Sequence, residues 1–252
     1  MRHFGSCIGR LRLATVHRLD TRLQFRYSST MSSVAMTHDQ TAPRGALIVF
    51  EGADRAGKTT QCKMLVDYLN AHGMVTEFWR FPDRTTAIGK MIDSYLGSQT
   101  DIDDAAVHLL FSANRWEKRE ALLSKLNQGI NLVVDRYAYS GVAFTAAKHV
   151  KGLNIEWCQA PDKGLPAPDT VFFLHLSAEA AAQRGGFGGE RYERPAFQEE
   201  VLRQFEAMRQ PDWRWVNADK TVEEIQEELR LDATKVIRRC SKGGVVLKML
   251  WQ

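Results

Sequence analysis

The stretch FEGADRAGKTTQ, residues 50–61, decides how this chain folds. Residues 52–59 match the pattern G-x-x-x-x-G-K-[ST], whose glycines let successive backbone N–H groups curl around a phosphate. An apolar run, ALIVF at 46–50, precedes the pattern, and apolar residues at helical spacing follow it until Gly73. A strand, a glycine-rich turn and a helix in this order predict a phosphate-binding loop, or P-loop.

The residues of this loop have separate expected roles. Lys58 reaches the terminal phosphates and Thr59 offers its hydroxyl to Mg²⁺, while the helix that follows directs its positive end at the anion. Asp54 and Arg55, an acid and a base in the middle of the loop, need a further explanation, because such a pair is also typical of a solvated surface. The expected nucleotide-binding residues of the loop pattern are Gly52, Ala56, Gly57, Lys58, Thr59 and Thr60.

Charge and composition restrict the partners. The net charge is +4, but residues 1–44 hold seven Arg and two Asp, a net +5, which leaves −1 for residues 45–252. A nearly neutral body argues against a nucleic-acid-binding face and favours small-molecule ligands. No apolar run approaches the ~20 residues that span a bilayer, so no membrane insertion is expected. The four cysteines are far apart, so the sequence indicates neither a zinc site nor a disulfide framework.

Residues 1–44 form an N-terminal extension that is expected to lie outside the fold. They are rich in Arg and hydroxyl residues and poor in acids, which is typical of a mitochondrial or plastid transit peptide. The alternative is a disordered extension with an internal start at Met31 or Met36, which would leave the protein in the cytosol or nucleus. Residues 45–252 form the expected catalytic domain.

The body alternates apolar runs with amphipathic segments, which predicts an α/β fold with a doubly wound parallel sheet. About five strands are expected, at 46–50, 76–81, 131–135, 170–176 and 213–218. A long helix is expected over about 103–128, and Pro195 should lie in the first turn of a later helix. Ligands of such a sheet bind at the carboxyl ends of its strands.

Four segments indicate a second, acceptor site beside the P-loop, whereas the Asn-Lys-x-Asp element of a GTPase is missing. RFPDRTTAIGK places Arg84 after a strand, where its guanidinium can fork onto a monophosphate. HLLFSANRWEKR puts Phe111 and Arg115 four residues apart on one helical face. LVVDRYAYSGVAF delivers Asp135 and Arg136 at a strand end, and QRGGFGGERYERP suits a mobile lid.

Residues 45–252 resemble the eukaryotic type of the thymidylate kinase family, whose members phosphorylate dTMP with ATP. The segments EGADRAGKTTQ, RFPDR, LLFSANRWE, VVDRYAYSGVAF and GERYE look like those of the family and stand in the same order. The resemblance implies a P-loop NTPase fold, ATP as donor, Mg²⁺ as cofactor and a homodimer. It also implies that Asp54 contacts the sugar 3′-hydroxyl and that Arg55 neutralises the phosphates in transit.

The same resemblance assigns the acceptor site. Arg84 and Arg136 would hold the dTMP phosphate, and Asp135 would lie near Mg²⁺ or only anchor its loop. Phe111 would stack on thymine and Arg115 would bond its carbonyl edge, although Phe111 also fits a buried helical stripe. The implied dTMP-binding residues are Asp54, Phe81, Arg84, Phe111, Arg115, Arg136, Ser140, Gly141 and Tyr192.

In the lid, Tyr192 would crowd a ribose 2′-hydroxyl and thereby select deoxynucleotides. Arg184 would contact the donor nucleotide, and the role of Arg194 is left open. The catalytic set that the resemblance implies is Arg55, Lys58, Asp135 and Arg136, and the implied metal site is Thr59 and Asp135.

Two alternatives to this function are kept. The acceptor could be another pyrimidine nucleotide, such as dUMP, dCMP or UMP, because a pocket for one methyl group discriminates by only ~1–3 kcal/mol. The chain could also be a catalytically silent nucleotide-binding regulator, but the intact Arg55, Lys58, Thr59 and Asp135 argue against that.

Overall fold

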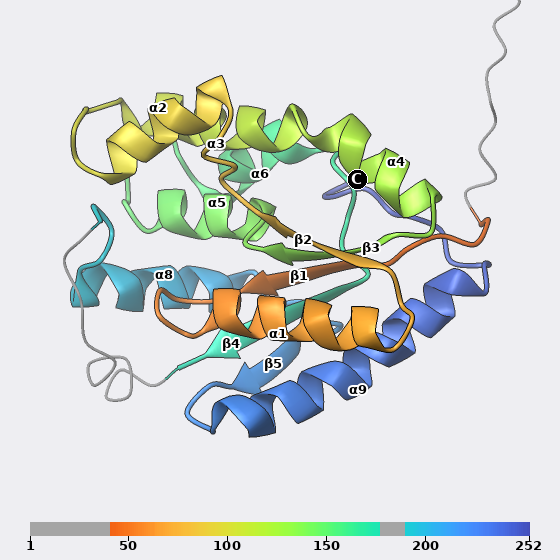
Figure 1. The fold of residues 1–252 in the computed structure, drawn as a ribbon. Coiled ribbons are helices and arrows are strands. Elements are labelled where there is room, and N and C mark those ends of the chain that lie inside the picture. The colour runs from red at the N-terminus through yellow and green to blue at the C-terminus, as the bar shows by residue number, and fades with distance from the viewer. Residues whose placement is uncertain (1–40, 177–189) are drawn as a thin grey trace, which may run out of the picture. The chain divides into compact units, whose positions relative to one another are not determined.

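The computed structural model describes residues 41–176 and 190–252. These residues form a five-stranded parallel sheet in the order β2-β3-β1-β4-β5 with helices on both faces (Figure 1). The predicted α/β fold with its doubly wound parallel sheet is confirmed. The strands are β1 (Leu47–Glu51), β2 (Thr76–Arg80), β3 (Asn131–Asp135), β4 (Thr170–His175) and β5 (Arg214–Asn217).

The apolar runs form the central strands because both faces of the sheet are covered. Side chains alternate along β1, so Leu47 and Val49 face one helical layer while Ile48 and Phe50 face the other. One layer holds α1 (Lys58–Ala71) and α9 (Val222–Ser241), which also pack against each other. The remaining helices are α2 (Ala87–Leu96), α3 (Asp104–Trp116), α4 (Arg119–Asn127), α5 (Ala138–Ala146), α6 (Ile155–Gln159), the 3₁₀ turn η1 (Ala160–Asp162) and α8 (Pro195–Ala207).

The single helix expected over 103–128 was wrong, because the chain breaks it into α3 and α4. Its start was correct: Asp103 caps α3 by accepting from the N–H groups of Ala105 and Ala106. The break falls at Glu117 and Lys118, whose side chains bond to the loop after β2. Glu117 accepts from the hydroxyl of Thr86 at 2.6 Å, and Lys118 pairs with Asp83 at 2.7 Å. These long-range contacts, rather than a local Gly or Pro, end α3.

Arg44, which was counted with the N-terminal extension, packs within the body. Its guanidinium is buried and forks onto both carboxylate oxygens of Asp169 at 2.7 Å. Asp169 also accepts from the backbone N–H of Leu47 at the start of β1. The fold therefore begins a few residues before 45. No helix of the described residues is both long and apolar enough to cross a membrane.

Because the strands are parallel, the carboxyl ends of β1, β2 and β3 lie at one edge of the sheet. Glu51, Arg80 and Asp135 are the last residues of these strands. The P-loop, the loop that contains Arg84, and Arg136 follow directly, so the sheet topology gathers these three parts of the expected site.

Candidate active site

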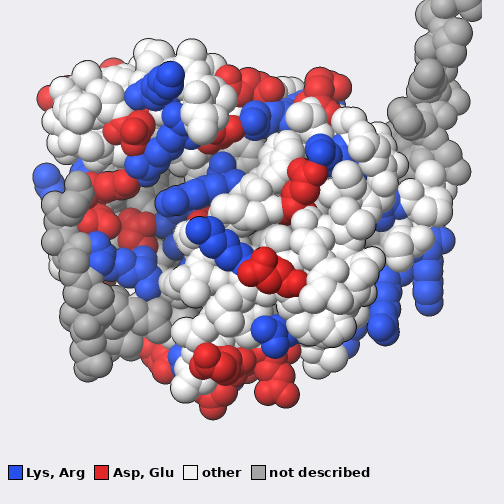
Figure 2. All heavy atoms as spheres, in the orientation of Figure 1, with Lys and Arg blue, Asp and Glu red and all other residues white. Residues whose placement is uncertain are grey.

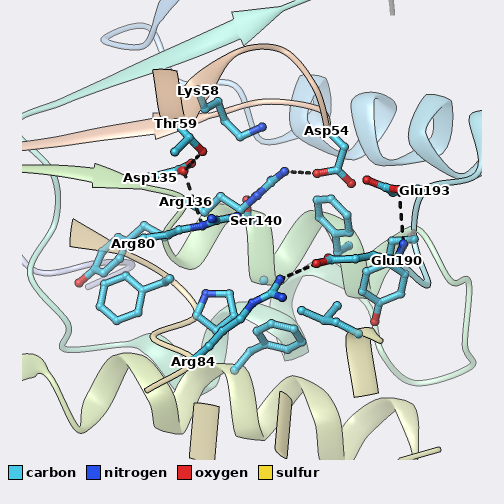
Figure 3. A pocket seen from close by; sticks show the side chains of 18 of the residues that line it. Asp54, Lys58, Thr59, Arg80, Arg84, Asp135, Arg136, Ser140, Glu190 and Glu193 are labelled. Carbon is cyan, nitrogen blue, oxygen red and sulfur yellow. Dashed lines mark hydrogen bonds and ion pairs between the residues drawn. The ribbon is translucent and has the colours of Figure 1, made fainter. Parts of the chain in front are cut away.

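A pocket of about 370 Å³ lies at this edge of the sheet (Figure 3). Most of the residues expected from the sequence line it. They are Asp54, Arg55, Gly57, Lys58, Thr59, Thr60, Phe81, Arg84, Phe111, Arg115, Asp135, Arg136, Ser140, Gly141 and Tyr192. Gly52 and Ala56 do not appear in the lining, and Arg184 lies outside the described residues.

The P-loop has the backbone that its glycines predict. Gly52 has φ +134°, and a Cβ atom there would lie 2.4 Å from the carbonyl oxygen of Leu174. Gly57, with φ +88°, precedes α1, whose first turn has no side-chain cap. Arg55 also adopts a left-handed conformation, with φ 64°. The uncapped N–H groups at the start of α1 are therefore available to an anion.

Lys58 lies inside the loop rather than in solvent. Its ammonium donates to the carbonyl oxygen of Ala53 at 2.6 Å. Burial, together with the charge of Arg136, lowers the pKa of Lys58 to about 8, although Asp54, Asp135 and Glu51 oppose the shift. A bound phosphate would supply the negative charge that this buried ammonium needs.

Thr59 and Asp135 bring two oxygens to one point. The hydroxyl of Thr59 hydrogen-bonds to the buried carboxylate of Asp135, and Nε of Arg80 lies 3.7 Å from the same carboxylate. Hydroxyl and carboxylate oxygens suit a hard cation such as Mg²⁺, so these residues fit the expected metal. No cluster of three or more His, Cys, Asp or Glu in the described residues could hold a metal ion. A cation here would therefore depend on ligand phosphates and water as well.

Ion pairs join the arginines of the pocket to carboxylates (Figure 3). Arg136 pairs with Asp54 and also donates to the carbonyl oxygen of Gly52 at 3.2 Å and the hydroxyl of Ser140 at 3.1 Å. Arg84 pairs with Glu190 at 2.8 Å and with Asp93 at 2.7 Å. Figure 3 shows the Arg84 and Arg136 side chains pointing into the same space, where a phosphate could join them.

Asp54 is held as a carboxylate. Burial works to raise its pKa, but the charges of Arg136 and Lys58 and a hydrogen bond from Gln198 lower it below its usual range. The acid-base pair of the P-loop is thus no solvated surface pair. Asp54 faces Arg136, and Arg55 pairs with Glu193 at 3.1 Å.

At the other end of the pocket, Arg115 is fixed by a buried ion pair. Its guanidinium forks onto Asp162, with Nε at 3.1 Å and Nη2 at 2.5 Å from the two carboxylate oxygens. Gly141 makes room for it, because a Cβ at Gly141 would lie 2.9 Å from Nη2 of Arg115. Phe111 packs against the apolar cluster of α2 and α3 and also lines the pocket, so its position is compatible with a core role and with the predicted contact to the base.

Arg191, Tyr192 and Arg194 differ in whether they face the pocket. Tyr192 lines the pocket, whereas Arg191 turns away and donates to the backbone of α2 and to Asp101. Arg194 is the N-cap residue of α8, and its backbone N–H donates to the carbonyl oxygen of Tyr192. Only Tyr192 of these three faces the site.

Three supporting residues were not predicted. Glu51 is fully buried and accepts from the N–H groups of Tyr137 at 3.0 Å and Ser140 at 3.1 Å; burial raises its pKa. An acid that ends an apolar strand was the signal for it. Gln198 accepts from the N–H of Asp54 and donates to its carboxylate, and Asp162 holds Arg115. Neither of these two has a local sequence signal.

The charges that line the pocket belong to a mixed surface. On the face drawn in Figure 2, the basic and acidic side chains of the described residues are interspersed around the hollow. A broad single-sign face suited to nucleic acid is not seen on that side of the described part of the chain.

Comparisons with known proteins agree with this geometry. The family model for thymidylate kinase matches residues 50–229. The chain is 47% identical over 239 residues to a thymidylate kinase of Arabidopsis thaliana, covering 95% of this chain and 88% of that protein. It is 51% identical over 214 residues to a human thymidylate kinase, covering 84% of this chain and 99% of that protein.

A solved structure gives the same result at the level of the fold. The thymidylate kinase from Candida albicans matches with a TM-score of 0.74 and 36% identity, covering 83% of this chain and 100% of that one. Five expected motifs, the observed fold, the family model and these relatives all agree, and the chain belongs to the thymidylate kinase family.

Proposed function

We propose that this protein transfers the γ-phosphate of Mg-ATP to dTMP, forming dTDP for the supply of DNA precursors. We infer dTMP as the acceptor and ATP as the donor from membership of the thymidylate kinase family. The observation that supports the chemistry is that one pocket is lined both by the P-loop and by arginines from two other strand ends. Phosphoryl transfer needs such a pairing, because donor and acceptor phosphates must be aligned and their charge neutralised.

We assign the donor end to the P-loop. Lys58 and the N–H groups from Gly52 to Thr60 hold the ATP phosphates, and Arg55 stabilises the charge that develops during transfer. Arg184 stays a predicted donor contact. Mg²⁺ would be held by Thr59 and Asp135 and would neutralise the phosphate oxygens.

The acceptor end follows from the positions of the arginines. Arg84 and Arg136 align the dTMP phosphate, and Asp54 receives the 3′-hydroxyl of the sugar. Arg115, Phe111 and Phe81 surround the base, with Ser140 and Gly141 behind it. Tyr192 borders the sugar, where it excludes a 2′-hydroxyl.

The protein forms a homodimer through α2 and α3. These helices expose three large apolar side chains, Met91 (52%), Leu109 (48%) and Trp116 (38%), which a partner subunit would cover. We expect a dimer mass in sedimentation, and a monomer after Leu109→Glu. A monomeric wild type would contradict this assignment.

Residues 1–44 direct the protein to an organelle. A fluorescent protein fused behind residues 1–44 should enter mitochondria or plastids, and a chain that begins at Met36 should stay outside them. Equal distribution of the two would contradict the targeting role.

A coupled ADP-release assay tests the function. The full chain with Mg-ATP is offered dTMP, dUMP, UMP, dCMP and AMP in parallel. We expect a strong preference for dTMP. The Candida albicans relative is described as having broad substrate specificity, so the ratio of kcat/KM values decides, not mere turnover. Preference for UMP or AMP would show that the acceptor site is assigned wrongly.

A further inference from the structure

We propose that Tyr95 and Lys148 are positioning residues that hold the ring of Tyr192 against the sugar and so set the preference for deoxyribonucleotides over ribonucleotides. The inference rests on the proposed function and deepens it, because it identifies the residues that fix the Tyr192 ring, called the sugar wall below, beside the sugar of the acceptor. Neither residue lines the pocket, and no step of phosphoryl transfer uses either one.

Lys148 is a cation without a role in the proposed chemistry. Its side chain is 9% exposed, and its ammonium donates to the carboxylate of Asp104 at 2.6 Å and to the hydroxyl oxygen of Tyr95 at 3.2 Å. The ammonium also lies 5.5 Å from the ring centroid of Tyr95 and 5.2 Å from that of Tyr192. One cation therefore joins the two rings, through the hydroxyl of Tyr95 and the ring of Tyr192.

Tyr95 connects α2 to Tyr192. The two hydroxyl oxygens lie 3.1 Å apart, and the rings meet edge to face with centroids 6.1 Å apart. The backbone of this segment is fixed at the same place, because Arg191 donates from Nε to the carbonyl oxygen of Tyr95 at 2.9 Å and lies over its ring. Burial raises the pKa of Tyr192, so its hydroxyl stays protonated and able to hydrogen-bond.

Two further aromatic rings contact Tyr192. Phe197 stacks on it at 5.3 Å and Phe144 lies at 5.5 Å. Phe144 also lines the pocket beside Tyr192. A ring with four such partners, Tyr95, Lys148, Phe144 and Phe197, loses contacts if it moves aside.

The position of Tyr192 along the pocket matches the sugar of a nucleotide. Phe144, its neighbour on one side, lies under the guanidinium of Arg136 at 5.3 Å, at the phosphate end. On its other side, Tyr192 packs against the α2 and α3 cluster, which Phe111 also contacts at the base end. A sugar lies between phosphate and base, so this wall meets it.

Steric exclusion depends on the stiffness of the wall. A 2′-hydroxyl is rejected only by as much free energy as it costs to displace the ring that it meets. Removing the hydrogen bond between the two tyrosines should therefore admit ribonucleotides more readily, while deoxynucleotides, which do not press on the ring, are affected less.

The test compares kcat/KM for dTMP with that for 5-methyluridine 5′-monophosphate, which differs only by the 2′-hydroxyl. In the full-length enzyme, Tyr95→Phe keeps the ring and removes the hydroxyl. We expect the deoxy-to-ribo ratio to fall about three- to tenfold, the factor for one lost hydrogen bond. Lys148→Met should lower the ratio in the same direction, and it carries the test if Tyr95→Phe does not fold.

Two variants make the result specific. Tyr139→Phe removes the hydroxyl of another buried tyrosine, one that packs against Trp213 and Trp251 and does not line the pocket, so the ratio should stay constant. Tyr192→Ala should lower the ratio at least as much as Tyr95→Phe.

The outcomes separate the inference from its premises. If Tyr192→Ala lowers the ratio but Tyr95→Phe and Lys148→Met reduce kcat/KM equally for both nucleotides, the positioning role is wrong and the sugar role of Tyr192 survives. An unchanged deoxy-to-ribo ratio in Tyr192→Ala would show that Tyr192 does not exclude the 2′-hydroxyl, and the inference would then be wrong as well. A wild type that does not phosphorylate dTMP overturns the proposed function itself.

Discussion

The two ends of the pocket are built in different ways. The donor end comes mainly from one continuous stretch, the P-loop residues 52–60, with Asp135 of β3 beside Thr59. The geometry of this loop is mostly backbone shaped by Gly52 and Gly57. The acceptor end is assembled from the ends of β2 and β3, from α3, and from the segment before α8. Its side chains depend on partners far away in sequence, such as Asp162 for Arg115, 47 residues apart. A continuous site fails when its own residues change, whereas an assembled site also fails when a remote partner does.

The largest effect should follow a change in the donor end alone. Arg55→Ala removes the charge that we assign to the phosphates in transit, and such an arginine contributes about 10³–10⁵-fold to the rate. We expect kcat to fall by that factor. The dissociation constant for dTMP, measured by calorimetry, should change less than about fivefold, because the acceptor end is separate. A large loss of dTMP affinity would show that the two ends are one unit.

Removing Asp162, the distant ion-pair partner of Arg115, should disrupt the acceptor end almost as strongly. Asp162→Ala leaves Arg115 as a buried cation without its carboxylate, which costs about 3–5 kcal/mol of the free energy of unfolding. Denaturant unfolding should show this loss, and dTMP should bind more weakly. Glu120→Gln is the matched control: this partner of Arg119 is 85% exposed, so the change should cost less than about 1 kcal/mol. Similar losses in both variants would contradict the special role of the buried pair.

The pH dependence should again separate the ends. The pKa of Lys58 is lowered to about 8 in the free protein, so above pH 8 the amine loses its proton unless phosphates restore it. ATP binding should then take up a proton, and ATP affinity should fall by up to about tenfold per pH unit above 8, while dTMP affinity changes less. Calorimetry at pH 7 and pH 9, in buffers with different ionisation enthalpies, counts the protons.

The pH dependence of stability has the opposite sign to that of ATP binding. The unfolded chain keeps the Lys58 proton up to about pH 10.5, whereas the folded protein releases it near 8. Burial of the ammonium therefore costs stability below pH 8, and that cost declines as the pH rises from 8 to 10.5. In Lys58→Ala both the proton uptake and this slope should disappear. Proton uptake that persists in the variant would assign the titration to another group.

The same contrast explains what the sequence could predict. The three central strands β1, β3 and β4 were predicted because runs buried on both faces consist mainly of apolar residues. The edge strands β2 and β5 are partly exposed and carry a weaker signal, although they were also predicted. The P-loop was predicted because its constraints are local. Asp162 and Gln198 could not be found, since each acts through a contact that exists only after folding. The break between α3 and α4 was missed for the same reason: Thr86 and Asp83, 31 and 35 residues upstream, hold Glu117 and Lys118.

Gly141 was predicted from the sequence, but the reason for a glycine at this position is visible only in the folded protein. The resemblance placed it in the acceptor site without a reason, and the structure supplies one, because the guanidinium of Arg115 occupies the space of a side chain. Residue types can thus be predicted where a motif recurs, while their physical cause appears only in the packed protein.

The smallest expected effect concerns the support of the acceptor end. Asp103 is exposed and caps α3, which carries Phe111 and Arg115, by accepting from two backbone N–H groups. Asp103→Ala should cost about 1 kcal/mol, which for a domain of this size lowers the Tm by about 2–4 °C. Asp103→Asn keeps an acceptor at the cap and should lose much less. The value of kcat/KM for dTMP should stay within about twofold, since tertiary packing and the Arg115–Asp162 pair hold the far end of α3. A larger loss of dTMP activity than of stability would mean that the helix start also sets the position of the base pocket.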